Sequence, residues 1–317
     1  MQFRNFADLI KLIRESQSII PRDIDGVVAI PRSGLVPATL IALFENKMLT
    51  DVEGFLNNRL IAPGSRRTSE KWEMDPRQWR KVLIVDDSVS SGATLASVKA
   101  ALKKARPEVE AVSLAVFGAK THGSQADIVL EKVSVPRMFE WNVMHHPLLN
   151  RCCVDIDGVL CQDPLDAEND DGERYEHFLL NAKPLCLPTK RVGALVTSRL
   201  AKYRGLTEAW LSQHNVEYDE LIMLEGYTAN ERRALKLHAQ HKAQYYKALP
   251  NSVLFIESDA KQSLEIQNLS GKPVLHFPDM TIYSGTASQR IVRGSKYKLR
   301  RFASALKRRL SVGATEA

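Results

Sequence analysis

The chain has 317 residues, of which 44% are hydrophobic and 26% charged, a composition typical of a globular protein with two domains. No run of about 18 apolar residues occurs, so no membrane span is predicted, and the N-terminus lacks the apolar core of a signal peptide. The formal net charge of +7 belongs to the end of the chain, because residues 290–310 contain nine Lys and Arg and no acidic residue. We therefore expect a cytoplasmic protein with a nearly neutral body.

The first half of the chain alternates strand-like and helix-like segments. An amphipathic pattern over residues 1–16 predicts a helix, and the apolar segment 35–47 predicts another. The strand-like runs are rich in Val, Ile and Leu, which favours burial on both faces, and they lie at 26–30, 81–86 and 110–118. This alternation predicts a parallel sheet, and the polar stretch 59–80 predicts a long functional loop.

A second series of strand-like runs lies at 151–160, 191–199, 220–224, 252–258 and 272–277. A long helix is predicted over 229–249. The fold class is therefore α/β, with two doubly wound parallel-sheet domains and a basic amphipathic C-terminal helix. We place the domains at 1–148 and 149–285 and the basic tail at 286–317.

The segment 82–95 joins a predicted strand to a predicted helix through a polar loop. Asp86 and Asp87 end the strand, and small or hydroxyl-bearing residues follow: Ser88, Ser90, Ser91, Gly92 and Thr94. Amide groups at a helix N-terminus attract anions, glycine lets the backbone approach closely, and hydroxyls add donors, so this loop predicts a phosphate site. The two acids can accept hydrogen bonds from vicinal ribose hydroxyls, or hold Mg²⁺ shared with the sugar.

A second loop, residues 29–38, follows the first predicted strand. Its residues Arg32, Ser33 and Gly34 suit an anion at a turn between a strand and a helix. Two anion sites with an acid pair between them match a ribose that carries a 5′-phosphate and a 1-pyrophosphate.

These segments resemble type I phosphoribosyltransferases over residues 20–125. Residues 82–94 resemble the family's motif for 5-phosphoribosyl-1-pyrophosphate (PRPP), and residues 29–34 resemble its pyrophosphate loop. By this resemblance the acid pair binds the ribose hydroxyls, and the loop from Ser88 to Thr94 binds the 5′-phosphate. The long polar loop corresponds to the flexible catalytic loop, with candidate pyrophosphate contacts at Arg66, Arg67 and Lys71.

The resemblance implies displacement at the anomeric carbon of PRPP by a base or base-like nucleophile, in the manner of orotate phosphoribosyltransferases. Mg²⁺ and basic groups would stabilise the departing pyrophosphate. Purine, pyrimidine and other acceptors stay open. A domain that binds PRPP as a sensor, without catalysis, is the alternative.

Asp155 and Asp157 lie two residues apart at the end of the predicted strand 151–160. Residues i and i+2 of a strand share a face, so both carboxylates can reach one site. One can attack a phosphoryl group while the other protonates the leaving oxygen, and Gly158 permits the turn that follows. Two carboxylates that face a phosphate need a cation, which implies Mg²⁺.

Residues 151–280 resemble the phosphatases of the haloacid-dehalogenase (HAD) superfamily, and the D-x-D-G-x-L segment around both acids resembles their first motif. By this resemblance Thr197, with Ser198 as second choice, holds the phosphoryl group. Lys242, with Lys247 as second choice, neutralises it. The fourth motif departs from the family pattern, and the expected metal ligands are Asp155, Asp157, Glu257 and Asp259. Hydrolysis of a phosphomonoester through a phospho-aspartate is the implied reaction.

Our preferred hypothesis is a bifunctional enzyme whose second domain hydrolyses a phosphomonoester, for which the 5′-phosphate of the first product is one choice. In one alternative the first domain senses PRPP and regulates the phosphatase. In another the basic tail recruits the chain to RNA or an anionic membrane, although docking on the protein or at an oligomer contact is slightly favoured. A homodimer is usual among similar transferases. Trp141, His145 and His146 are interpreted as interdomain contacts rather than as a base-stacking group.

Overall fold

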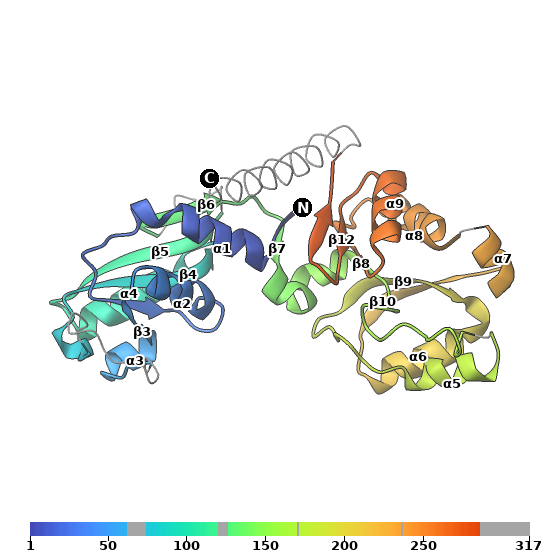
Figure 1. Ribbon diagram of the computed structural model, residues 1–317, viewed down its shortest axis with the longest axis horizontal. Coiled ribbons are helices and arrows are strands. Elements are labelled where there is room, and N and C mark those ends of the chain that lie inside the picture. The colour runs from blue at the N-terminus through green and yellow to red at the C-terminus, as the bar shows by residue number, and fades with distance from the viewer. Residues whose placement is uncertain (62–73, 120–125, 170, 236, 286–317) are drawn as a thin grey trace, which may run out of the picture. The chain divides into compact units, whose positions relative to one another are not determined.

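The structure is a computed structural model that describes residues 1–61, 74–119, 126–169, 171–235 and 237–285. It divides into two compact units, Met1–Trp141 and Asn142–Ala317 (Figure 1). The division falls a few residues before the boundary placed at residue 148. The predicted contacts Arg66, Arg67 and Lys71 and the predicted tail helix lie outside the described residues.

The first unit is built on a five-stranded parallel sheet in the order β3-β2-β4-β5-β6. Its strands are β2 (Gly26–Ala29), β3 (Met48–Asp51), β4 (Lys81–Val89), β5 (Glu110–Gly118) and β6 (Ile128–Lys132). The predicted parallel sheet is confirmed, and each strand predicted in this half forms. The sequence analysis missed β3 and β6, which lack a long apolar run.

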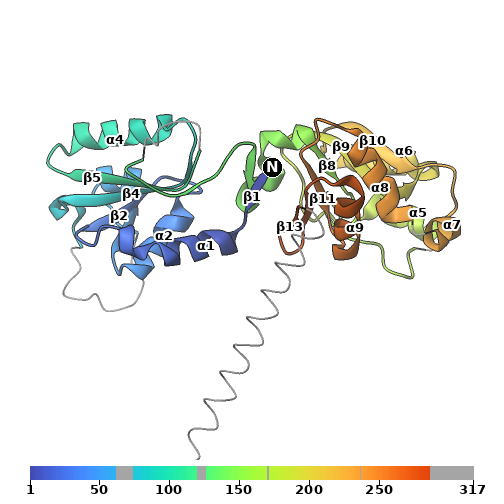
Figure 2. The same cartoon turned by 90° about the horizontal axis from the view of Figure 1, so that it is seen from above.

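Helices cover both faces of this sheet, and they are α1 (Phe6–Glu15), α2 (Leu35–Phe44), α3 (Val52–Leu56) and α4 (Ala93–Ala105). Leu9 of α1 and Val27 of β2 belong to the core on one face. Leu95 of α4 and Val28 of β2 belong to the core on the other. Figure 2 shows the same arrangement, with α1 and α2 on one side of the strands and α4 on the other. Successive strand residues point to opposite faces, so a strand covered on both sides is apolar at nearly every position.

The N-terminal segment differs from the helix predicted over residues 1–16. Its first residues form β1 (Gln2–Arg4), which pairs in parallel with β7 (Arg137–Phe139). The Asn5 side chain accepts a hydrogen bond from the Asp8 amide, and the Asp8 side chain accepts one from the Asn5 amide. This capping box fixes the start of α1, so the helical prediction was right for α1 and wrong for β1.

The second unit contains a six-stranded sheet in the order β10-β9-β8-β11-β12-β13. Its strands are β8 (Cys152–Val154), β9 (Val192–Leu200), β10 (Tyr218–Leu224), β11 (Leu254–Glu257), β12 (Val274–His276) and β13 (Thr281–Tyr283). The edge strand β13 is antiparallel to β12, and the other neighbours are parallel. Every strand predicted in this half forms, and β13 was not predicted.

The helices of the second unit are α5 (Glu173–Asn181), α6 (Arg204–Gln213), α7 (Ala229–Ala234), α8 (Leu237–Ala248) and α9 (Ala260–Ser270). In Figure 1, α8 and α9 lie on one side of the sheet and α5 and α6 on the other. The single helix predicted over 229–249 is thus divided into α7 and α8. The buried residues of α8 recur at helical spacing, and they are Ala239, Lys242, Ala243 and Tyr246.

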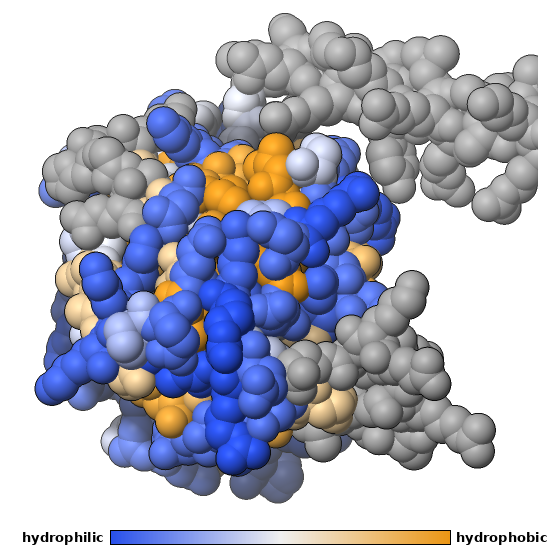
Figure 3. Space-filling model, turned by 90° about the vertical axis from the view of Figure 1, so that its left-hand side faces the viewer, coloured by the Kyte–Doolittle hydropathy of each residue, from blue (hydrophilic) through white to orange (hydrophobic). Residues whose placement is uncertain are grey.

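Short 3₁₀ helices complete the structure, at η1 (Gln17–Ile19), η2 (Pro76–Gln78), η3 (Glu140–His145), η4 (Pro147–Arg151) and η5 (Ala201–Tyr203). Within the described ranges, no helix combines the length and apolarity needed to cross a bilayer. The face of the molecule in Figure 3 is mainly hydrophilic, and polar side chains separate its hydrophobic areas.

Candidate functional site

The acid pair forms the centre of the candidate site in the first unit and lies near the end of β4, which continues to Val89 rather than ending at Asp86 as predicted. Asp87 is 6% exposed. Its two carboxylate oxygens accept hydrogen bonds from neutral donors, Ser33 Oγ at 2.8 Å and Trp141 Nε1 at 2.8 Å. The structure therefore brings the predicted pyrophosphate loop and the predicted acid pair together.

The Asp86 carboxyl group lies beside Asp87 and is largely shielded from water. Burial raises the pKa of Asp86 from 3.8 to about 7, and the neighbouring Asp87 charge adds to the rise. One of its oxygens accepts a hydrogen bond from the Asp87 amide at 2.9 Å. Hydroxyl donors or a cation on a ligand would therefore stabilise the charged form of this pair.

The loop after the acid pair leads into α4 with most of its polar groups accessible. Ser90, Ser91 and Thr94 are exposed, and Ser88 is half-buried. Gly92 precedes α4 with a φ of 77°, a left-handed conformation that favours glycine. Gly92 itself has no side chain to cap α4. The Ala93 amide donates to Ser91 Oγ at 3.4 Å, and the amides that follow it are in a position suited to an anion.

The loop that contains Arg32 approaches β4 closely. A Cβ atom on Gly34 would lie 2.4 Å from the Ile30 carbonyl oxygen and 2.9 Å from the Val85 carbonyl oxygen, so only glycine fits there. Arg32 itself is exposed, and the Pro31–Arg32 peptide bond is cis. Because β2 and β4 are parallel neighbours, both predicted anion loops lie at the same edge of the sheet.

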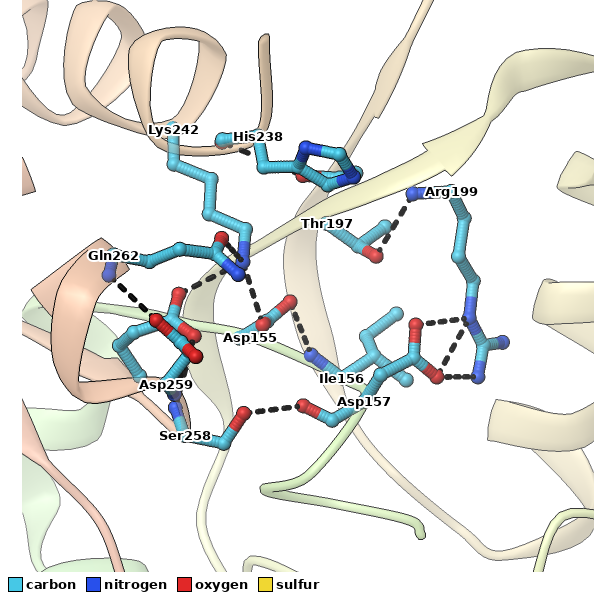
Figure 4. Close-up of polar contacts among 12 residues, drawn as sticks. Asp155, Ile156, Asp157, Thr197, Arg199, His238, Lys242, Ser258, Asp259 and Gln262 are labelled. Carbon is cyan, nitrogen blue, oxygen red and sulfur yellow. Dashed lines mark hydrogen bonds and ion pairs between the residues drawn. The ribbon is translucent and has the colours of Figure 1, made fainter. Parts of the chain in front are cut away.

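The candidate site of the second unit lies at the carboxyl ends of β8, β9 and β11, as Figure 4 shows. Lys242 of α8 is 2% exposed, and its Nζ donates to Asp155 Oδ2 at 2.6 Å and to Glu257 Oε2 at 2.7 Å. Burial alone would lower the pKa of Lys242, but the two carboxylates outweigh it and raise that pKa. Burial also raises the pKa of Asp155, which Lys242 opposes and Glu257 and Asp157 increase.

Asp157 is bound by an arginine that the sequence analysis did not single out. The Arg199 side chain has 0% exposure. Its Nη2 donates to Asp157 Oδ1 at 2.6 Å and its Nε to Asp157 Oδ2 at 3.1 Å. Burial acts to lower the pKa of Arg199, but the Asp157 charge outweighs it and raises that pKa. A two-point contact of this kind fixes the plane of the carboxylate (Figure 4).

Thr197 lies on β9 between these two ion pairs (Figure 4). It is 1% exposed, and its Oγ1 accepts a hydrogen bond from the Arg199 amide at 3.2 Å. The hydroxyl of Ser198 instead donates to the His238 carbonyl oxygen at 3.4 Å. Of the two lysines considered, Lys242 contacts the acids and Lys247 is exposed.

A cavity of about 340 Å³ opens onto this cluster. It is lined by Asp155, Asp157, Asp163, Pro164, Asn169, Tyr175, Thr197, Ser198, Arg199, Arg232, His238, Lys242, Ser258, Asp259 and Gln262. The lining is mainly polar, with acids and cations side by side. It can therefore bind a charged small molecule.

The donor atoms of this cavity fit a hard cation. Burial raises the pKa of Asp163, and the charges of Asp157 and Glu257 add to the rise, so carboxylates are crowded here. Oxygen ligands of this kind suit Mg²⁺. Within the described residues, however, no three acidic, His or Cys side chains lie close enough to hold a metal by themselves. Bound water and substrate oxygens would have to complete the coordination, as is usual for Mg²⁺.

Two of the expected metal ligands have other partners in the structure. Glu257 is 0% exposed, and its Oε1 accepts hydrogen bonds from the amides of Ser258 and Asp259, both at 3.0 Å. Asp259 is exposed and caps α9, with its Oδ1 accepting from the Gln262 amide at 2.7 Å. These contacts favour a role for Glu257 in holding Lys242. Direct metal binding by either acid stays a prediction.

The sequence analysis missed three functional contacts at these sites. Arg199 lies two residues after Thr197 on the same strand, and strand periodicity could have placed it at the site. Asp163 follows the predicted strand 151–160, and the sequence analysis gave it no role at the site. The contact between Trp141 and Asp87 joins residues 54 apart, and nothing local in the sequence signals it.

Comparison with known proteins supports the assignment of the first unit. Residues 63–148 match the family model of the phosphoribosyl transferase domain, so the chain contains such a domain. The chain is 34% identical over 87 residues to the xanthine-guanine phosphoribosyltransferase of Chromohalobacter salexigens. That match covers 27% of this chain and 52% of the relative, so this chain spans about half the length of the curated relative.

Two solved structures also show some likeness. The Helicobacter pylori xanthine-guanine-hypoxanthine phosphoribosyltransferase has 17% identity and a TM-score of 0.35, and the match covers 45% of this chain and 93% of that chain. The Aeropyrum pernix orotate phosphoribosyltransferase has 18% identity and a TM-score of 0.29, and the match covers 41% of this chain and 71% of that chain. The assignment rests on the family model and on the relative from Chromohalobacter salexigens.

Proposed function

We propose that the first unit transfers the 5-phosphoribosyl group of PRPP to a base, and that the second hydrolyses a phosphomonoester. The observation that carries the first part is the junction of Ser33, Asp86 and Asp87 beside the start of α4. Neutral hydroxyls of a ribose can replace the neutral donors that now occupy Asp87. A purine base is the first acceptor to test, because the curated relative is named a xanthine-guanine phosphoribosyltransferase.

In the transfer step, the base nitrogen forms a bond to the anomeric carbon while the bond to pyrophosphate breaks. The acid pair would hold the ribose hydroxyls, and the amides at the start of α4 would hold the 5′-phosphate. Mg²⁺, where bound, would neutralise charge on the leaving pyrophosphate. Arg32 and the loop residues Arg66, Arg67 and Lys71 are the proposed pyrophosphate contacts.

The observation that carries the phosphatase part is the buried Lys242 between Asp155 and Glu257. This arrangement is expected of a HAD-like nucleophile held by a lysine. An Asp155 oxygen would attack phosphorus and form an aspartyl phosphate, the alcohol would leave with a proton, and water would then release phosphate. Asp157 is the proposed donor of that proton, and Thr197 would hold a phosphoryl oxygen. Mg²⁺, held in part by Asp155 and Asp259, would supply charge neutralisation.

A second candidate function is PRPP sensing, and one observation favours it. Both oxygens of Asp87 already accept from protein donors, Ser33 and Trp141, so a ligand that binds Asp87 would add to or replace contacts that join separate segments of the unit. A PRPP sensor needs contacts that change when the ligand binds, and it does not need to transfer the phosphoribosyl group. It predicts that PRPP binds without release of pyrophosphate.

Mass spectrometry of reactions with PRPP, Mg²⁺ and a pool of bases separates these functions. The wild type is compared with the double variant Asp86→Asn/Asp87→Asn and with Asp155→Asn. Release of pyrophosphate and formation of a nucleoside by the wild type, with accumulation of the nucleotide in Asp155→Asn, supports two consecutive steps. Survival of PRPP under all conditions contradicts the transferase part and leaves the sensor.

A further inference from the structure

The lining of the cavity in the second unit includes Lys242, Arg199 and Arg232, and these cations differ in their partners. Among its lining cations, Lys242 is paired with Asp155 and Glu257, and Arg199 is paired with Asp157. Arg232 of α7 also lines the cavity. Within the part of the chain that the structure describes, it takes part in no such ion pair.

The guanidinium group of Arg232 is buried at 7% exposure and is only partly satisfied. Its Nη1 donates to the Ser198 carbonyl oxygen at 2.7 Å, directly after the proposed phosphoryl contact Thr197. Its Nε has no hydrogen-bond acceptor among the described residues. A buried donor without an acceptor is destabilising, and more so when it is charged, so such a group in a cavity wall points to a ligand.

Tyr175 of α5 lies beside this arginine and belongs to the same wall of the cavity. It is 4% exposed, and its ring packs against Phe178 and edge-on against Tyr203, with centroid distances of 6.0 Å and 5.1 Å. Burial raises the pKa of the Tyr175 hydroxyl and Asp157 adds to the rise, while Arg199 and Arg232 oppose it. The Tyr175 hydroxyl and the guanidinium groups of Arg199 and Arg232 therefore lie close together in the cavity.

We propose that Arg232, together with Tyr175, binds a second anionic group on the leaving alcohol of the phosphomonoester. This inference rests on the proposed phosphatase function, because Asp155, Thr197 and Lys242 would hold the phosphoryl group itself. The anion is a carboxylate or a second phosphate, since both accept hydrogen bonds from a guanidinium group. Substrates whose alcohol is neutral would offer Arg232 no charged acceptor and leave its Nε buried without a partner.

The test uses the full chain and matched substrates that differ only in the second group. These are 2-phosphoglycolate with a carboxylate, ethylene glycol bisphosphate with a phosphate, and 2-hydroxyethyl phosphate with a hydroxyl. Phosphate release is measured for the wild type, Arg232→Met, Arg232→Lys and the exposed control Arg191→Met. Circular dichroism and thermal midpoints show whether each variant folds.

We expect Arg232→Met to lower kcat/KM for one or both anionic substrates about ten- to a hundredfold and to leave the hydroxyl substrate within about twofold. Arg232→Lys should recover part of the loss, and Arg191→Met should change nothing. Whichever anionic substrate loses its advantage identifies the anion. An equal loss on all three substrates, or no loss on any, overturns the inference.

A binding experiment separates this inference from the proposed function. The Asp155→Asn protein and its Arg232→Met double variant are titrated with the same three compounds by calorimetry. The second anion site is supported if the Asp155→Asn protein binds the anionic compounds more tightly than the hydroxyl compound and the double variant does not. This result would hold even if the wild type hydrolyses nothing. Hydrolysis without such a preference leaves the phosphatase function and removes the anion site.

Discussion

The two units each end a central parallel strand with a pair of acids, but they surround those acids with different partners. In the first unit Asp87 is held by the neutral donors Ser33 and Trp141, and the pKa of Asp86 rises to about 7 through burial and the adjacent charge. In the second unit each acid contacts a buried cation, Lys242 for Asp155 and Arg199 for Asp157. The first pair is thus hydrogen-bonded by neutral groups, with Arg137 as a cation that acts on Asp87 from nearby, whereas each acid of the second pair contacts a cation directly.

The largest effect should come from Asp155, the proposed nucleophile of the second unit. We expect Asp155→Asn to reduce phosphate release by about a thousandfold or more, because the amide cannot form the phospho-enzyme. PRPP consumption by the same protein should stay at the wild-type level, since the first unit is untouched. Retention of phosphate release would show that another residue attacks the phosphoryl group.

Breaking the second ion pair should affect folding most strongly. Arg199→Met leaves the Asp157 carboxylate without its cation in a shielded site, and we expect a loss of about 3–5 kcal/mol in the free energy of unfolding. The matched control Arg191→Met removes an arginine whose side chain is 54% exposed and should change stability by less than about 0.5 kcal/mol. Urea unfolding of both proteins measures the difference in stability. Equal midpoints would show that the ion pair between Arg199 and Asp157 does not stabilise the fold.

The pKa of Asp86 makes a prediction about pH. A carboxyl group whose pKa is raised from 3.8 to about 7 on folding costs stability as pH rises through that interval, because the unfolded chain ionises first. Asp86→Asn should therefore be more stable than the wild type by about 1–3 kcal/mol at pH 8 and nearly equal to it at pH 3. Urea midpoints across this range give the result. A difference in unfolding free energy between the two proteins that does not change with pH would show that Asp86 ionises at its ordinary pKa in the folded protein.

The smallest effect should come from the neutral donor on Asp87. Trp141→Phe keeps an aromatic ring but removes the Nε1 hydrogen bond, and we expect a loss of about 1 kcal/mol in unfolding free energy. If PRPP binds at the acid pair as proposed and makes no contact with the indole, its affinity should stay nearly the same in the variant. A large fall in PRPP affinity, measured by calorimetry, would show that the indole contacts the ligand directly.

The sequence predicted strand cores and strand-end chemistry well, and for a physical reason. Strands covered on both faces are continuously apolar, so β4 and β9 can be recognised from residue type alone. The acids that follow such strands must lie at one edge of the sheet, which placed Asp86, Asp87 and Asp155. Lys242 was placed by resemblance, and the structure shows its contacts with Asp155 and Glu257.

The contacts that escaped prediction depend on packing between distant segments. Trp141 contacts Asp87 because β7 and η3, which lie far along the chain from β4, bring it back to the first sheet. No periodic pattern in the sequence predicts this contact. The short strand β1 was taken for helix because its apolar spacing continues that of α1, and only its pairing with β7 decides the matter. Short elements of this kind are fixed by their partners more than by their own residues.

The pairing of β1 with β7 also bears on how the protein is made. Gln2–Arg4 are synthesised long before their partner strand Arg137–Phe139, which follows only at the end of the first unit. Until then the N-terminal segment has no strand to pair with and stays open to chaperones or to wrong partners. Completion of the first unit therefore coincides with the start of synthesis of the second.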